Sequence, residues 1–278
     1  MREADLHIHT SASDDSVLEP EQIFRRARAR GLSAVAFTDH EQMSRLDEGR
    51  RLSAAFGIAF LGGIELTSSW RGQYAHILGY FRNGAAPSFD TFLVERVWPG
   101  RRKAHLQLLD PLQHHGAEVT TAEYDAEARA GGYHLPLYRI LRRKGAVSNL
   151  EEYVLIREDE GFEGCYLPIP EVIRAIHNAG GIAVLAHPIH TGSFGVGFYR
   201  FDGEDIALLA RAGLDGVEVF HPTHDEGQTR HFAQVADDLG LVKTGGSDSH
   251  GSPAAVKRVV GAITCNWDEV VEYLERRA

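Results

Sequence analysis

Apolar and polar positions follow two rhythms along the chain. Short apolar runs of strand length recur at 4–9, 33–40, 58–68, 74–81, 182–188, 215–222 and 241–251. Segments with apolar residues on one helical face lie at 19–31, 43–57, 170–181, 203–213 and 227–240. Alternation of about seven strands with helices predicts an α/β fold with a parallel sheet, either open or closed into a barrel.

One long segment departs from this rhythm. From 88 to 168 the periodicity is almost continuously helical, broken at 99–100, 114–116 and 130–132, where Pro-Gly, His-His-Gly and Ala-Gly-Gly occur. We therefore predict a barrel domain formed by 1–87 and 169–278, with a small helical insertion, or cap, at 88–168.

The first predicted strand alternates between two kinds of side chain. Asp5, His7 and His9 share one face, because residues two apart in a strand point the same way, while Leu6 and Ile8 share the other. A face of carboxylate and imidazole is costly to bury unless a ligand such as a metal ion compensates. The alternative is an edge strand whose polar face is exposed to water.

Nearly every predicted strand carries a histidine or a carboxylate at or near its C-terminal end. In parallel α/β folds these ends meet at the edge where active sites assemble. Any one such residue could be a hydrogen-bonded structural residue, but so many together favour a metal site. The candidate ligands are His7, His9, Asp14, His40, Glu65, His76, His187, Asp248 and His250.

The ligand types and their number narrow the choice of metal. Imidazole and carboxylate without sulfur suit Mn²⁺, Zn²⁺ or Fe²⁺ better than Ca²⁺. Nine ligands exceed the need of one ion, so two or three divalent ions sharing a bridging carboxylate are expected. Cys165 and Cys265 are isolated, which suits a reducing compartment and gives no thiolate site.

Charge and hydropathy limit the partners. A formal charge of -10 disfavours general attraction to nucleic acid or anionic membranes, although bound divalent ions would reverse the sign locally. The sequence holds no apolar run of membrane-spanning length and leads into a strand without a signal peptide. We expect a soluble, cytoplasmic protein that has no membrane association and no obligate protein partner.

Six motifs resemble one family of enzymes. The segments DLHIHTSASDD, FTDH, GIELTS, AHILGY, AHP and GGSDSHG are similar to those of the PHP (polymerase and histidinol phosphatase) phosphoesterases. They run from residue 5 to 251 in the family's order and cover 88–168 only loosely. The resemblance implies a distorted, TIM-like (β/α)7 barrel and usually three metal ions.

The resemblance also divides the ligands among the ions. It implies three groups of ligands, and Glu65 bridges the first two. The groups are His7, His9, Glu65 and Asp248; Glu65, His76 and His187; and Asp14, His40 and His250. Asp15 stands where many relatives have glycine, so the third carboxylate is Asp14 or Asp15, and the family spacing favours Asp14. Asp39 is expected to orient a ligand histidine, and Asp5 to act likewise.

The expected chemistry is metal-assisted hydrolysis. Coordination lowers the pKa of water to about 7, so a hydroxide bridging two ions would attack phosphorus in line. Glu65, Asp248 and His187 would act through the metals, and the ions would neutralise charge on the phosphoryl oxygens. The proton donor to the leaving oxygen stays open among four histidines: His134, His190, His221 and His224.

The insertion bears on the substrate. Residues 131–154 resemble the cap of a PHP subgroup that acts on nucleotides and short RNA ends. His134 and Arg139, with Arg142 and Arg143 nearby, could face a second phosphate or a base, although a basic run can also be a solvated helix face. Arg200 is another candidate phosphate contact, and the glycine-rich segment 192–198 is expected to form a loop over the site.

We therefore expect hydrolysis of phosphate esters of nucleotides, for example a 3′,5′-nucleoside bisphosphate. The alternative is a 5′-end exonuclease on short RNA or DNA, which would use the same metals. Histidinol phosphatase activity and a non-catalytic metal-binding module are less favoured, because the cap resemblance and the full ligand set argue against them.

Overall fold

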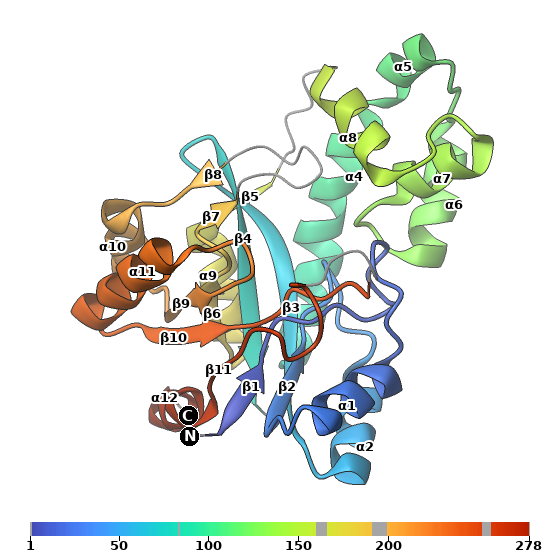
Figure 1. The fold of residues 1–278 in the computed structure, drawn as a ribbon. Coiled ribbons are helices and arrows are strands. Elements are labelled where there is room, and N and C mark those ends of the chain that lie inside the picture. Colours follow the sequence, from blue (N-terminus) through green and yellow to red (C-terminus); the bar gives the residue numbers. More distant parts are fainter. Residues whose placement is uncertain (1, 83, 160–165, 191–198, 252–256, 278) are drawn as a thin grey trace.

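The computed structural model describes residues 2–82, 84–159, 166–190, 199–251 and 257–277, except for the side chains of residues 158, 159, 190 and 199. A strongly curved sheet forms the body of the molecule, with helices outside it (Figure 1). A group of helices, drawn in green, stands at one end of the sheet.

The curved sheet closes into the expected barrel. Its order is β10-β9-β6-β4-β3-β2-β1-β11. Beyond β1, Leu6 donates its N–H to the carbonyl of Gly245 at 3.1 Å, and Ile8 forms a parallel bridge with Ser249. The strands are β1 (Glu3–Asp5), β2 (Ala34–Phe37), β3 (Ala59–Trp70), β4 (Gln73–Phe81), β6 (Ile182–Leu185), β9 (Gly216–Phe220), β10 (Val242–Gly245) and β11 (Cys265–Asn266).

The expectation of a wholly parallel sheet is wrong at β4. Arg71 and Gly72 connect β3 to β4 with φ values of 50° and 79°, and such a tight turn joins only antiparallel strands. β4 is also antiparallel to β6. As a result His76, early in β4, lies opposite Thr67 near the end of β3, at the same edge as the C-terminal ends of the parallel strands.

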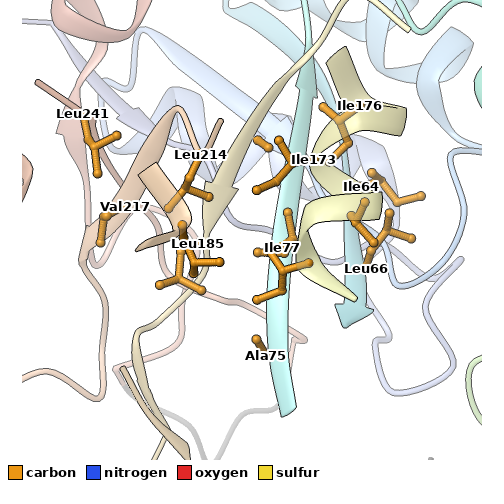
Figure 2. Close-up of a cluster of buried hydrophobic side chains, with 14 of the residues drawn as sticks. Ile64, Leu66, Ala75, Ile77, Ile173, Ile176, Leu185, Leu214, Val217 and Leu241 are labelled. Carbon is orange, nitrogen blue, oxygen red and sulfur yellow. The ribbon is translucent and has the colours of Figure 1, made fainter. Parts of the chain in front are cut away.

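Helices cover the outside of the barrel. Figure 2 shows Ile64, Leu66 and Ile77 of the β3–β4 hairpin against Ile173 and Ile176 of α9, all fully buried. Full burial of one such side chain contributes about 1.5–3 kcal/mol. The outer helices are α1 (Pro20–Ala29), α2 (Leu46–Phe56), α9 (Ile169–Asn178), α10 (Gly203–Arg211), α11 (Glu226–Leu239) and α12 (Trp267–Arg277).

The insertion is helical, as expected, and it has two parts. Phe89, Leu93 and Val97 pack into the barrel core, whereas buried residues between Leu108 and Tyr153 form a hydrophobic cluster of their own. This division favours a cap that begins after Val97; the boundaries 1–87 and 169–278 for the barrel and 88–168 for the cap stay a prediction. The insertion contains α3 (Pro87–Phe92), a π-helix (Leu93–Val97), α4 (Trp98–Leu106), α5 (Leu109–Leu112), a 3₁₀ turn (Gln113–His115), α6 (Thr121–Gly131), α7 (Pro136–Lys144) and α8 (Leu150–Asp159).

Three short strands complete the fold. β5 (Leu167–Pro168) pairs with β3, and β7 (Ile189–His190) pairs with β8 (Tyr199–Arg200). Among the helices of the described ranges, none combines the length and the apolar character needed to cross a membrane.

A buried carboxylate ties elements together at the N-terminal edge of the sheet. Asp215, just before β9, accepts hydrogen bonds from Ala183 N of β6 at 2.8 Å and from the Tyr273 hydroxyl of α12 at 3.2 Å. It also pairs with His177 of α9, 2.6 Å from Nε2, and with Arg277 of α12. Burial alone would raise the pKa of Asp215, but these hydrogen bonds outweigh burial and lower it.

Replacement of this carboxylate is expected to destabilise the fold. Asp215→Asn should lower the free energy of unfolding by about 2 kcal/mol, measured by urea denaturation near pH 7. Because the folded pKa lies below the unfolded one, the contribution is present above the unfolded pKa and is lost as the pH falls through the folded value. The difference between wild type and variant should therefore shrink below about pH 4.

Glu275→Gln is the matched control, because Glu275 pairs with Arg82 at 3.2 Å on the exposed surface. Its unfolding midpoint should stay near the wild-type value. Equal stability of the Asp215 variant and the wild type at pH 7 would contradict the role assigned to this carboxylate.

Candidate metal centre

Glu65 lies at the centre of the polar end of the barrel. It is 1% exposed, on β3, and its two oxygens lie 2.8–3.3 Å from five imidazole nitrogens. Burial by itself would raise its pKa, but the surrounding histidines hold the pKa of this carboxyl well below its usual range. The nitrogens are His7 Nε2, His9 Nε2, His40 Nδ1, His76 Nδ1 and His187 Nε2.

Asp248 is a second carboxylate beside the same histidines. Its Oδ1 atom lies 3.4 Å from His9 Nε2 and 3.6 Å from His7 Nε2. The other oxygen accepts a hydrogen bond from Arg258 Nη1 at 2.6 Å. His7, His9 and Asp248 thus present three ligand atoms within 4.8 Å of one another.

Asp15, and not Asp14, is the acidic residue at the third group of candidate ligands. Asp15 Oδ2 lies 3.6 Å from His40 Nε2 and 3.5 Å from His250 Nε2. Burial would raise the pKa of Asp15, but His250 and His40 outweigh burial and hold it well below its usual range.

The structure does not bring Asp14 into this group. Its carboxylate accepts a hydrogen bond from Leu135 N at 2.7 Å and pairs with Arg139. The insertion therefore occupies Asp14 and leaves Asp15 facing the histidines. The two adjacent carboxylates were the signal in the sequence, but their spacing could not tell which of them turns inward.

Hydrogen bonds donated from Nδ1 orient two of the candidate ligand histidines. His7 Nδ1–H donates to Glu218 Oε1 at 2.9 Å, and His250 Nδ1–H donates to the carbonyl of Asp248 at 3.0 Å. A neutral imidazole carries one N–H, so in each ring the lone pair is on Nε2, the atom that faces the cluster. This is the tautomer that a metal ligand needs.

Asp39 orients a third histidine through a serine. Asp39 accepts hydrogen bonds from Thr10 N at 2.6 Å and from Ser13 Oγ at 3.2 Å. Ser13 Oγ therefore acts as an acceptor toward His9 Nδ1, 3.1 Å away, and leaves the His9 Nε2 lone pair toward Glu65. Asp39 thus reaches its histidine indirectly, through the loop that follows the first strand.

Asp5 has a different role from the expected one. It accepts hydrogen bonds from the backbone N–H groups of Ser247 at 2.9 Å, Gly261 at 2.7 Å and His7 at 3.4 Å, so it acts on the backbone of this histidine rather than on its ring. Burial raises the pKa of Asp5 to about 6, against these hydrogen bonds. It holds the loop after β10 against the first strand.

Glu218 is a functional candidate that the sequence reasoning missed. It is fully buried on β9, where it accepts hydrogen bonds from His7 Nδ1 and from His187 N at 2.8 Å. Burial would raise its pKa, but His7 and His221 outweigh it and lower the pKa to about 2. A charged residue in the otherwise apolar strand Gly216–Phe220 was the signal in the sequence.

The described side chains fit divalent metal ions. The buried atoms without a hydrogen-bonding partner in the described part of the chain include three at this centre: His9 Nε2, His40 Nδ1 and Asp15 Oδ1. The donor set is nitrogen and oxygen without sulfur. The backbone is strained here as well, because His187 and Asp248 have φ values of 22° and 47°.

The three residues expected to contact the substrate, His134, Arg139 and Arg200, differ in their contacts. The His134 ring stacks on His40 with centroids 4.0 Å apart. Arg139 is paired with Asp14, in the loop after the first strand, and with Glu127 Oε1 of the insertion at 2.8 Å, so it links the insertion to the barrel rather than pointing free at a phosphate. Arg200 is exposed on β8 and stays a predicted substrate contact.

The histidines expected as candidate proton donors to the leaving oxygen differ in how near they lie to the centre. His221 Nε2 lies 3.3 Å from Asp248 Oδ2, whereas His224 Nδ1 donates to the carbonyl of Val219 at 2.9 Å. The His190 side chain and the glycine-rich segment 192–198 lie outside the described residues, as does Cys165. Cys265 is buried and free, away from the ligand groups.

A cavity of about 840 Å³ adjoins the centre, between the barrel and the insertion. His40 and Asp14 line it on the metal side. Its lining from the insertion includes Trp98 and Tyr133, whose rings stack with centroids 5.4 Å apart, and the exposed residue Arg129. Aromatic faces beside cationic groups are a surface typical of base and phosphate binding.

Three curated bacterial proteins resemble the chain over most of its length. A 5′-3′ exoribonuclease of Haemophilus influenzae is 28% identical, covering 98% of this chain and 94% of its own. A phosphoribosyl 1,2-cyclic phosphate 1,2-diphosphodiesterase of Eggerthella lenta is 30% identical (92% and 97%). A 3′,5′-nucleoside bisphosphate phosphatase of Chromobacterium violaceum is 29% identical (94% and 91%).

Solved structures show the same fold. A chain from Bifidobacterium adolescentis superposes with a TM-score of 0.73 at 24% identity, covering 98% of this chain and 96% of its own. A protein from Chromobacterium violaceum described as an amidohydrolase gives 0.71 at 26% identity (99% and 96%).

The model of the PHP domain matches residues 5–162, which include six of the nine candidate ligands. Together with the full-length relatives, this match confirms the resemblance seen in the motifs, the distorted barrel and the hydrolase class. The chain belongs to the PHP family of metal-dependent phosphoesterases.

Proposed function

We propose that this protein hydrolyses phosphate esters of nucleotides, with a 3′,5′-nucleoside bisphosphate as the expected substrate. The observation that carries this proposal is the position of the 840 Å³ cavity, which opens directly beside His40 at the third ligand group. A site of this size accepts a whole nucleotide next to the metal centre. The name of the Chromobacterium relative supports the same substrate class.

We assign the metal ligands by the contacts of the centre. His7, His9, Glu65 and Asp248 would hold one ion, and Glu65, His76 and His187 a second. For the third we propose Asp15, His40 and His250, with Asp15 in place of the expected Asp14. Mn²⁺, Zn²⁺ and Fe²⁺ all suit this donor set, and a cytoplasmic location remains a prediction.

Divalent ions at these positions would polarise the phosphoryl oxygens and lower the pKa of water. The chain's own residues supply the orientation. Glu218 and Ser13 keep the proton of His7 and of His9 on Nδ1, so that both rings present Nε2 inward. Because Glu65 and Asp248 are buried among imidazoles, their charge is held at fixed positions before substrate arrives.

A second candidate function is a 5′-end exoribonuclease. The cavity volume exceeds the need of one nucleotide, and the Haemophilus relative carries this activity in its name. Both functions use the same metal centre and differ in what occupies the cavity: the base and second phosphate of a small substrate, or the next nucleotides of a strand.

The third ligand group is tested by a matched pair of variants. Asp15→Asn should lower the amount of bound metal and the hydrolysis rate, because it removes the carboxylate that faces His40 and His250. Asp14→Asn, one residue away, should keep the wild-type metal content. Metal per chain is measured by mass spectrometry after desalting, and the reverse pattern would restore Asp14 as the ligand.

Glu218 is tested through metal affinity. Glu218→Gln should weaken Mn²⁺ binding about 10- to 100-fold, because loss of the carboxylate that orients a metal-binding histidine has this typical effect. Calorimetric titration measures the affinity, and circular dichroism checks the fold. An affinity equal to that of the wild type would show that His7 does not depend on Glu218.

The substrate is tested on a panel with Mn²⁺-loaded protein. It contains adenosine 3′,5′-bisphosphate, AMP, histidinol phosphate, and a 5′-phosphorylated RNA dinucleotide and pentanucleotide, with products separated by chromatography. Phosphate release from the bisphosphate is expected, and His9→Ala should abolish it while the protein stays folded. Stepwise release of mononucleotides from the oligomers would favour the exoribonuclease. No product from any substrate, with metal bound to the protein, would refute both the phosphatase and the exoribonuclease function.

A further inference from the structure

His134 reaches the metal centre from the insertion, just before α7. Its ring lies almost parallel to that of His40, with centroids 4.0 Å apart and an angle of 9°. Its Nε2 atom lies 3.7 Å from Asp15 Oδ2. By distance alone Asp15, His40 and His134 could hold an ion together.

The hydrogen bond at His134 Nδ1, the other ring nitrogen, determines whether Nε2 carries a proton or a lone pair. Arg101 Nη2, on α4, lies 2.9 Å from His134 Nδ1. A guanidinium has five N–H donors and no acceptor, and it stays protonated in proteins. Arg101 must therefore donate and His134 Nδ1 must accept, which leaves the proton of the neutral ring on Nε2.

This arrangement is the reverse of that at two ligand histidines. His7 and His250 each donate from Nδ1 to an oxygen, so their Nε2 atoms carry lone pairs toward the cluster. His134 instead presents an N–H toward the cluster. An N–H cannot coordinate a metal ion, but it can donate a hydrogen bond to an anion.

Arg101 is itself held in place. Its side chain is 7% exposed, with Nη2 3.5 Å from Glu41 Oε1, next to the ligand His40 in the chain. The guanidinium also lies over the ring of Tyr166, 5.1 Å from the centroid. Contacts with the barrel and with Tyr166 thus fix the donor that faces His134.

We propose that Arg101 is a positioning residue that fixes His134 as an Nε2–H donor, which excludes His134 from the metal ligands and presents its N–H, beside Asp15 Oδ2, to a phosphoryl oxygen of the substrate. The substrate part of this inference rests on the proposed function; the position of the proton does not. A fixed N–H donor where negative charge develops stabilises a transition state more than it stabilises free substrate.

Nitrogen NMR of the imidazole rings reads the tautomer directly. The full chain, ¹⁵N-labelled at histidine and loaded with diamagnetic Zn²⁺, is compared with Arg101→Met, Arg101→Lys and the control Arg96→Met. Arg96 lies in the π-helix and pairs with Glu171 at 2.7 Å, away from the centre. The His134 signals are assigned by their loss in His134→Gln.

The wild type and the Arg96 variant should show the proton on Nε2, and Arg101→Met should shift it partly or fully to Nδ1. Metal content of His134→Gln should equal that of the wild type. A wild-type proton on Nδ1, an unchanged tautomer in Arg101→Met, or the loss of an ion in His134→Gln would each overturn the inference. Should Arg101→Met fail to fold, the wild-type tautomer and the metal content of His134→Gln carry the test; Arg101→Lys, whose ammonium also only donates, should keep the proton on Nε2.

Kinetics then test the functional part. Arg101→Met should lower kcat/KM about 100-fold, mostly through kcat, as for loss of one transition-state donor, with Arg101→Lys between it and the wild type. Arg96→Met should keep the wild-type rate. If Arg101→Met keeps that rate as well, the directed hydrogen bond is overturned. Failure of the wild type on every phosphate ester would refute the proposed function, while the NMR and metal content would still decide the tautomer.

Discussion

The structure depends on one demanding arrangement: a fully enclosed carboxylate, Glu65, surrounded by imidazoles. Burial of a charge in a protein interior is costly unless partners compensate it. Here the partners come from segments distant in sequence, from His7 to His187, so the centre exists only when the barrel is closed. The apolar core around Ile64, Ile77 and Ile176 therefore supports the strain and desolvation of the polar end.

A second layer of polar residues keeps this end ordered. Glu218, Ser13 and the carbonyl of Asp248 each accept a hydrogen bond from an Nδ1–H group, while Asp39 fixes the loop that holds Ser13. The result is a set of histidines whose lone pairs converge before any ion binds. Such preorganisation reduces the rearrangement that binding and catalysis require.

Much of this was readable from the sequence, and the failures have physical causes. The alternation of His7 and His9 with apolar neighbours predicted an inward polar face. The strand–helix rhythm predicted a parallel sheet, open or closed, and the resemblance to the PHP family implied the barrel. The direction of β4 could not be predicted in this way, because the periodicity of a strand is the same in both directions. Only the shortness of the turn at Arg71 and Gly72 reveals that β4 is antiparallel to β3. Glu218 was overlooked although a charge in an apolar strand is a strong signal.

The choice between Asp14 and Asp15 shows a deeper limit. Adjacent residues in a loop point in different directions, and here Leu135 and Arg139, more than a hundred positions later, take up Asp14. A motif therefore locates a ligand only to within the segment that it spans. Long-range contacts from the insertion, which the motifs cover least, decide the atom.

The way the barrel closes has a consequence for the order of synthesis. The segment that carries His7 and His9 pairs with residues 245–249 on one side, and β1 pairs with β11 near residue 266. A ribosome therefore releases these two candidate ligands more than two hundred residues before the segment that closes the barrel beside them. Throughout that interval one side of the polar-faced strand lacks its closing partner, and the metal centre can mature only after translation of this barrel is nearly complete.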